Sequence, residues 1–274
     1  MLRRCYPLGK NKAFNLTYDD GALQDERLVS LLNRYGIKGT FNLNSQLMEQ
    51  EFEWVHENGM VVKRLPTRAV GLYQGHEIAS HTLTHPYMYA LSREEIMHQL
   101  TRDKKNLEAM TGEVVAGFAV PFDYYSDLIA ECVKECGFEY GRMSEASDSY
   151  VPWQDPYHWR TGLFHLSAEL DDFVEGFFKT EQELALCQIV GHSYDLDAWN
   201  LWEKLESILS KIAGDADILP MTHIELVRYL SAMEKAVLTG DTLQNQSSMD
   251  LWFRVDGKPC LLHPGETIGL HGGQ

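Results

Sequence analysis

The sequence lacks a long apolar run, has few cysteines and is short of basic residues. A membrane-spanning helix needs about 20 predominantly apolar residues in a row, and no stretch of the 274-residue chain supplies them. Five scattered cysteines do not make a disulfide framework. The 24 basic residues face 40 acidic ones, for a net charge of −16. Such a chain repels phosphate backbones, which argues against nucleic-acid binding.

The beginning of the chain also lacks the apolar stretch of an export signal. Residues 1–8 are basic, and Lys10 and Lys12 follow before any such stretch. We therefore expect a cytoplasmic protein, or an extracytoplasmic one if a signal was trimmed. The hydrophobic content of 44% is enough for a globular core and excludes intrinsic disorder.

The sequence does contain a repeated alternation of predicted strands and helices. Residues 13–18 alternate as a strand does, and apolar side chains then recur at helical spacing up to Tyr35. Further strands are predicted at residues 37–43, 114–120, 138–142, 187–191 and 218–221. Strands alternating with helices predict an α/β fold with a parallel sheet, closed or nearly closed into a barrel.

The pattern changes near the end of the chain. Residues 251–255 and 259–263 are short apolar runs on either side of Asp256-Gly257, a strong hairpin signal. We therefore expect a barrel over residues 1–240. We expect residues 241–274 to form a C-terminal β-hairpin appendage packed on it, not a second domain.

Three predicted strand ends carry titratable side chains, and strand ends hold the functional residues of βα barrels. They are Asp19-Asp20, the segment with His81 and His85, and His192. Two histidines four apart on a helical turn present both rings on one side. With one carboxylate they can hold a divalent ion. The alternatives are a chance spacing on a surface helix and aspartates that cap a loop.

Two of these segments resemble motifs of a known family. Thr-Tyr-Asp-Asp-Gly at residues 17–21 resembles the Thr-Phe-Asp-Asp-Gly signature of polysaccharide deacetylases, the family-four carbohydrate esterases with a nodulation-deacetylase homology domain. Residues 75–86 resemble their second motif across its whole length, and the resemblance covers roughly residues 10–235. It implies a distorted (β/α)-barrel of seven or eight strands that removes N- or O-acetyl groups from a sugar polymer with a metal.

The resemblance also implies a role for individual residues. These are Asp19 as general base, His192 as general acid, Asp20, His81 and His85 as metal ligands, and the Phe122 N–H as an oxyanion donor. The implied cofactor is a divalent metal, with Zn²⁺ favoured by the ligand set and Co, Ni or Mn also compatible.

The third motif departs from the family pattern. The family has Arg-x-Pro-Tyr or Arg-x-Pro-Phe, in which the arginine orients the catalytic aspartate. Here Ala119 stands at the arginine position, while Pro121 and Phe122 match. Loss of the arginine predicts a raised pKa and a looser orientation for Asp19. Arg142 could substitute, but an ordinary surface or ion-pair arginine is the simpler interpretation.

The fourth motif is poorly defined. Family members have an Asp-Trp-type pair that supports the acid histidine, and the candidates here lie within residues 147–159. Trp153, Tyr157 and Trp159 could form a wall on which a sugar stacks. Packing in the core or in loops is the alternative.

We therefore expect a metal-dependent deacetylase with a carbohydrate substrate, no nucleic-acid partner and no membrane span. Two alternatives stay open: a hydrolase of small non-sugar amides, and a metal-retaining barrel that binds sugar without turnover. The Ala119 departure keeps the second alternative open. Neither the sugar nor the oligomeric state follows from the sequence.

Overall fold

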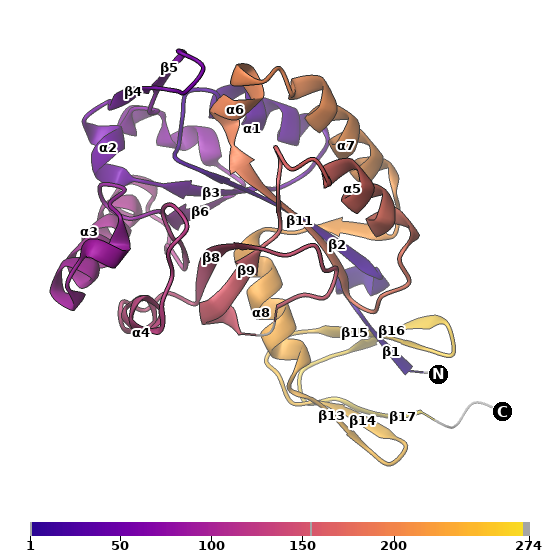
Figure 1. The fold of residues 1–274 in the computed structure, drawn as a ribbon. Coiled ribbons are helices and arrows are strands. Elements are labelled where there is room, and N and C mark those ends of the chain that lie inside the picture. Colours follow the sequence, from indigo (N-terminus) through magenta and orange to yellow (C-terminus); the bar gives the residue numbers. More distant parts are fainter. Residues whose placement is uncertain (1, 154, 271–274) are drawn as a thin grey trace.

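A computed structural model describes residues 2–153 and 155–270, and its centre is a parallel sheet curved into a nearly closed barrel (Figure 1). Eight strands pair in the order β10-β11-β2-β3-β6-β7-β8-β9, and β12 also pairs with β2. The strands are β2 (Lys12–Asp19), β3 (Thr40–Leu43), β6 (Glu77–Ser80), β7 (Gly117–Ala119), β8 (Tyr140–Ala146), β9 (Trp159–Thr161), β10 (Leu163–Phe164), β11 (Ala185–His192) and β12 (Ile218–Pro220). The predicted (β/α)-barrel is confirmed.

Gly162 joins the two ends of this strand order, because it lies between β9 and β10. A Cβ on Gly162 would lie 1.7 Å from the carbonyl oxygen of Gln188 in β11, so only glycine lets the chain cross so close. Beside this crossing, the Trp159 indole N–H donates to Gln188 Oε1 at 3.1 Å. The close crossing brings β9 against β11 and nearly closes the barrel.

Helices cover the outside of the barrel, with α1, α5, α6 and α7 along one side and α3 and α4 on another (Figure 1). They are α1 (Asp25–Arg34), α2 (Ser45–Glu49), α3 (Arg93–Thr111), α4 (Asp127–Glu135), α5 (Leu170–Lys179), α6 (Ser193–Ala198), α7 (Trp202–Gly214) and α8 (His223–Met233). Short 3-10 turns are η1 (Pro7–Gly9), η2 (Thr67–Tyr73), η3 (Met88–Ala90) and η4 (Pro156–His158). No helix within the described residues is long and apolar enough to cross a bilayer.

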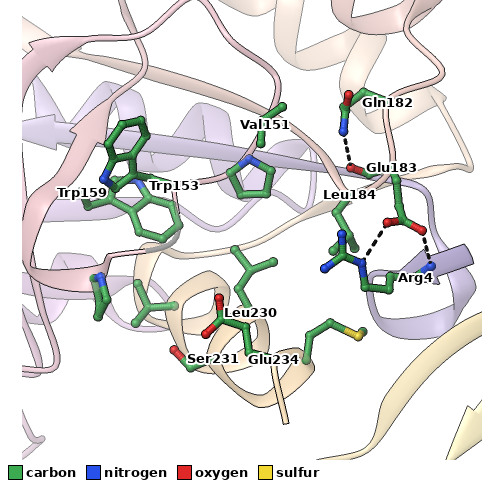
Figure 2. Close-up of a pocket in the computed structure, with 14 residues that line it drawn as sticks. Arg4, Val151, Trp153, Trp159, Gln182, Glu183, Leu184, Leu230, Ser231 and Glu234 are labelled. Carbon is green, nitrogen blue, oxygen red and sulfur yellow. Dashed lines mark hydrogen bonds and ion pairs between the residues drawn. The ribbon is translucent and has the colours of Figure 1, made fainter. Parts of the chain in front are cut away.

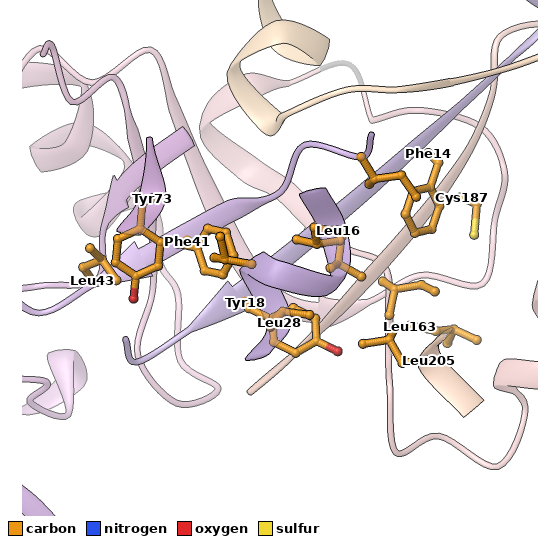
Figure 3. Close-up of a cluster of buried hydrophobic side chains, with 14 of the residues drawn as sticks. Phe14, Leu16, Tyr18, Leu28, Phe41, Leu43, Tyr73, Leu163, Cys187 and Leu205 are labelled. Atoms are coloured by element: carbon orange, nitrogen blue, oxygen red, sulfur yellow. The ribbon is translucent and has the colours of Figure 1, made fainter. Parts of the chain in front are cut away.

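The main core lies between the barrel strands and these helices. Phe14 and Leu16 of β2 and Phe41 of β3 belong to one buried cluster with Leu28 of α1 and Leu205 of α7 (Figure 3). All eight residues of β2 are buried, as expected for a parallel strand covered on both faces. This packing fixes the carboxyl end of β2, where the paired aspartates lie.

Three smaller sheets flank the barrel. They are β4 (Glu53–Val55) with β5 (Val61–Lys63), β1 (Leu2–Cys5) with β15 (Leu251–Val255) and β16 (Lys258–Leu262), and β13 (Ala236–Thr239) with β14 (Thr242–Asn245) and β17 (Thr267–Gly269). The predicted boundary after residue 240 divides the β13–β14 hairpin, and the N-terminal strand joins the C-terminal ones. Residues 271–274 of the predicted appendage lie outside the described residues.

Candidate active site

The three reactive strand ends meet at one end of the barrel. Asp19 ends β2 and His192 ends β11, and the register of this parallel pair sets them opposite each other. His81 and His85 follow β6. A cavity of about 330 Å³ opens at this end. Its lining includes Asp19, Asp20, His81, His85, Phe122, Arg142, Phe164, His192 and Tyr194.

Asp20, His81 and His85 form a cluster that could hold a metal ion, each with a ligand atom within 4.8 Å of the others. Asp20 Oδ1 lies 3.9 Å from His81 Nε2 and 3.4 Å from His85 Nε2. This buried oxygen accepts no hydrogen bond from the described residues. An unsatisfied carboxylate oxygen that faces two imidazole nitrogens fits a divalent cation.

The two histidines do not lie on a helical turn, as their spacing predicted, but on an irregular loop after β6. Thr82 and His85 have φ values of 68° and 55°, which bend the chain back so that both rings reach Asp20. The His81 Nδ1–H donates to the carbonyl oxygen of Ala119 at 2.8 Å, and this bond directs Nε2 toward the cluster.

Arg64, which follows β5, binds Asp20 from the side of the β4–β5 hairpin. Its Nη1 lies 2.8 Å from Asp20 Oδ1, outside hydrogen-bond geometry, and donates instead to the Asp20 backbone oxygen. The Tyr194 hydroxyl donates to Oδ2 at 3.1 Å. Burial raises the pKa of Asp20, but Arg64 and the neighbouring histidines outweigh it and hold the pKa far below its usual value. Asp20 is therefore ionised and suited to bind a cation.

Asp19 has the cationic partner that the third motif lacks. Arg142 Nη2 lies 2.6 Å from both carboxylate oxygens, and its side chain is only 3% exposed. Asn42 Nδ2 adds a hydrogen bond to Oδ1 at 2.7 Å. The interpretation of Arg142 as an ordinary surface arginine is wrong, because the residue is a buried partner of the predicted base.

The register of the sheet explains how Arg142 replaces the missing arginine. Ala119 on β7 and Arg142 on β8 are paired residues of adjacent parallel strands, so their side chains leave the sheet on the same side. Burial raises the pKa of Asp19, but Arg142, His81 and His192 outweigh it and hold the pKa below its usual value. The premise of the expected rise, an Asp19 without a cationic partner, therefore does not hold.

His192 is held by Asp195, three residues further along the chain in α6. His192 Nδ1 lies 3.0 Å from Asp195 Oδ2, and its Nε2 faces Asp20 Oδ2 at 4.0 Å. Burial lowers the pKa of His192, but the hydrogen bond to Asp195 and the charges of Asp20 and Asp19 raise it more, to above its usual value. The carboxylate that supports His192 does not come from residues 147–159, where the sequence placed it.

Two further histidines bind the same carboxylate. His165 Nε2 lies 3.2 Å from Asp195 Oδ2, and His56 Nε2 lies 3.2 Å from Oδ1. The Tyr18 hydroxyl donates to His165 Nδ1 at 2.7 Å. Tyr18 stands where the family signature has phenylalanine, and this replacement is a sequence signal that could have indicated the network.

Phe122 lines the cavity and has a φ of 60°, which a bulky side chain rarely adopts. The three predicted stacking residues do not line it. Trp153 and Trp159 border a separate groove with Arg4 and α8 (Figure 2).

Trp159 is 2% exposed, and the Tyr157 hydroxyl donates to the Phe138 carbonyl at 3.1 Å. The structure therefore does not bring the predicted sugar-stacking wall to this cavity, and Trp159 is packed in the core as the alternative has it.

The chain is similar to known proteins in sequence and in fold. Residues 8–141 match the family model for polysaccharide deacetylases. Over this segment the chain is similar to the polysaccharide deacetylase family. It is 27% identical over 151 residues to the peptidoglycan-N-acetylglucosamine deacetylase of Bacillus cereus, covering 54% of this chain and 61% of that protein. It is 31% identical over 112 residues to a chitin deacetylase of Pestalotiopsis sp., covering 40% and 34%.

The chain thus spans between about a quarter and three fifths of the length of the curated relatives it matches. Among solved structures, a family-four carbohydrate esterase pseudoenzyme of Bacillus anthracis shares the fold, with a TM-score of 0.55 and 18% identity over 82% of this chain and 68% of that one. The fold alone therefore does not establish turnover in this chain.

Proposed function

We propose that this chain is a metal-dependent hydrolase that removes acetyl groups from an amino-sugar polymer. One observation carries the proposal: Asp19 and His192 lie opposite each other at the rim of a cavity that also holds Asp20, His81 and His85. A base, an acid and a metal-ligand set around one cavity are the groups that acyl transfer to water requires.

The metal would be held by Asp20, His81 and His85, and Zn²⁺ suits two imidazoles and one carboxylate. When bound, it supplies Lewis acidity for the acetyl carbonyl. Asp19, held by Arg142 and Asn42, accepts a proton from the attacking water.

The Phe122 N–H is the proposed donor to the oxyanion. His192, whose Nδ1 is bonded to Asp195, presents Nε2 to the cavity and donates a proton to the leaving group. An amine needs this proton to leave, whereas an activated phenolate does not.

The relatives support the choice of substrate. The names of the Bacillus cereus and Pestalotiopsis proteins designate deacetylation of peptidoglycan N-acetylglucosamine and of chitin. We therefore place an N-acetylated hexosamine polymer ahead of O-acetylated sugars. Intact Asp19, Asp20 and His192, with Arg142 in place of the motif arginine, favour turnover over sugar binding alone.

The test is acetate release from acetylated chito-oligosaccharides by protein loaded with Zn²⁺. Asp19→Asn should keep the metal and lose about 10²–10⁴-fold in turnover, the usual effect of losing a general base. Asp172→Asn, an exposed change on α5, is the matched control and should behave as wild type.

Two results would contradict the proposal. Loaded wild-type protein that binds the oligosaccharide but releases no acetate would indicate a binding barrel. Acetate or amine released only from small non-sugar amides would indicate the other hydrolase class.

A further inference from the structure

Four exposed aromatic rings lie in an unbroken series of contacts that begins at His85. The Phe122 ring centroid lies 4.6 Å from that of His85 and stacks on Tyr87 at 3.8 Å with an interplanar angle of 12°. Tyr87 lies 5.6 Å from Tyr89, and Tyr89 lies 5.6 Å from Tyr124. The four side chains of this aromatic platform (Phe122, Tyr87, Tyr89 and Tyr124) are between 42% and 61% exposed.

Two loops of the active site build the platform. Tyr87 and Tyr89 follow His85 in the loop after β6, and the buried Met88 between them anchors the turn η3. The other two rings come from the loop after β7. There Tyr125, next to Tyr124, donates its hydroxyl to the carbonyl of Tyr157 at 2.7 Å. The exposed rings therefore stand on anchored backbone.

The placement of Phe122 connects the platform to the cavity. Its ring lines the cavity and also stacks on Tyr87, while its backbone holds a φ of 60°. A strained conformation in a bulky residue persists only where the surroundings impose it, and such residues cluster at functional sites. Contiguous exposed apolar surface of this kind marks a binding site.

We propose that the aromatic platform binds the sugar units next to the one whose acetyl group enters the cavity. This inference rests on the proposed function. The ligand is a linear oligosaccharide of pyranose rings with equatorial substituents, because such rings present flat C–H faces that stack on aromatic faces. The tyrosine hydroxyls of the platform add polar contacts for sugar hydroxyls. A series of rings that extends beyond the cavity suits an oligomer, not a single sugar.

The test compares kcat/KM for the acetylated pentamer and dimer of glucosamine. Wild-type protein should prefer the pentamer. Tyr89→Ala and Tyr124→Ala should each reduce the ratio of pentamer to dimer kcat/KM by about two- to tenfold, mainly through KM of the pentamer. Tyr89→Phe and Tyr124→Phe keep the rings and should retain most of the preference. Phe52→Ala removes an aromatic ring of similar exposure beside β4 and should not change the ratio.

Calorimetric binding of the deacetylated pentamer gives a readout that does not depend on turnover. If wild-type protein releases no acetate but the two alanine variants weaken pentamer binding, the proposed function fails and the platform stands. Suppose instead that wild-type protein releases acetate, and that the double variant Tyr89→Ala with Tyr124→Ala keeps the wild-type ratio of pentamer to dimer kcat/KM and the wild-type affinity for the pentamer. The proposed role of the platform is then overturned. An absence of any length preference in wild type would overturn it as well, and the rings would then serve another contact.

Discussion

Replacing Arg142 by alanine tests whether this residue substitutes for the arginine missing from the third motif. Its guanidinium lies 2.6 Å from both oxygens of Asp19, and both side chains are nearly buried. Arg142→Ala leaves a buried carboxylate whose strongest remaining donor is Asn42 at 2.7 Å.

The expected cost follows from that geometry. Breaking a buried ion pair costs about 3–5 kcal/mol of unfolding free energy, and the remaining Asn42 bond favours the lower figure. For a chain of this size, 3 kcal/mol corresponds to a fall in Tm of about 10 °C. Turnover measured well below Tm should fall about 10²-fold, because Asp19 is no longer held in a productive orientation.

The assay should separate orientation from folding. Metal content and circular dichroism at the assay temperature establish that Arg142→Ala is folded and loaded. Guanidinium ion at a non-denaturing concentration should restore part of its turnover, since the ion can occupy the vacated position beside Asp19. The same ion should not restore Asp19→Asn.

The double variant Ala119→Arg with Arg142→Ala gives the sharpest test. Because residues 119 and 142 are paired on adjacent parallel strands, an arginine at 119 can enter the space that Arg142 leaves. We expect at least a tenfold gain in kcat/KM over Arg142→Ala alone, as predicted for a restored ion pair. The reasoning is refuted if folded, loaded Arg142→Ala has wild-type kcat/KM.

Three more predictions concern the metal, the acid and a buried carboxyl. Changing both His81 and His85 to alanine should abolish Zn²⁺ binding, and equal metal content by elemental analysis would disprove the ligand assignment. His192→Ala should reduce amide deacetylation far more than cleavage of an activated aryl acetate at unchanged metal content, and equal losses would remove its role as acid. Burial raises the pKa of Glu77 from 4.5 to about 7. A carboxyl whose pKa is raised in the folded state lowers the free energy of unfolding as pH rises from about 4.5 to 7. Between pH 4.5 and pH 8, wild type should therefore lose up to about 3 kcal/mol of unfolding free energy relative to Glu77→Gln, as measured by urea unfolding. A difference that does not change with pH would contradict this.

The barrel and the cluster of reactive strand ends could be predicted because both depend on local pattern. Strand and helix alternate along the chain, and the ends of parallel strands meet at one edge wherever such a barrel closes. The histidine pair was predicted with the wrong backbone: the positive φ of His85, not a helix, brings its ring to Asp20. Spacing alone does not distinguish these two conformations.

The supporting residues could not be predicted because their partners lie far away in the sequence. Arg64 reaches Asp20 across 44 residues, and Arg142 reaches Asp19 across 123. His56 and His165 reach Asp195 from two other segments and have no motif of their own. Only tertiary packing brings such pairs together.

The position of Arg142 also bears on how family members without the motif arginine are judged. A family-four pseudoenzyme shares this fold, so the fold does not separate active from inactive chains. The proposed mechanism needs a cation at the Asp19 carboxylate, and Arg142 supplies one from the position paired with Ala119 on the neighbouring strand. Ala119 and Arg142 are paired on adjacent parallel strands and their side chains leave the sheet on the same side, so a charge moved from one strand to the next can reach the same carboxylate. The relevant comparison is therefore the charge that surrounds the predicted base in space, and Arg142 supplies that charge although its position in the sequence differs from that of the motif arginine.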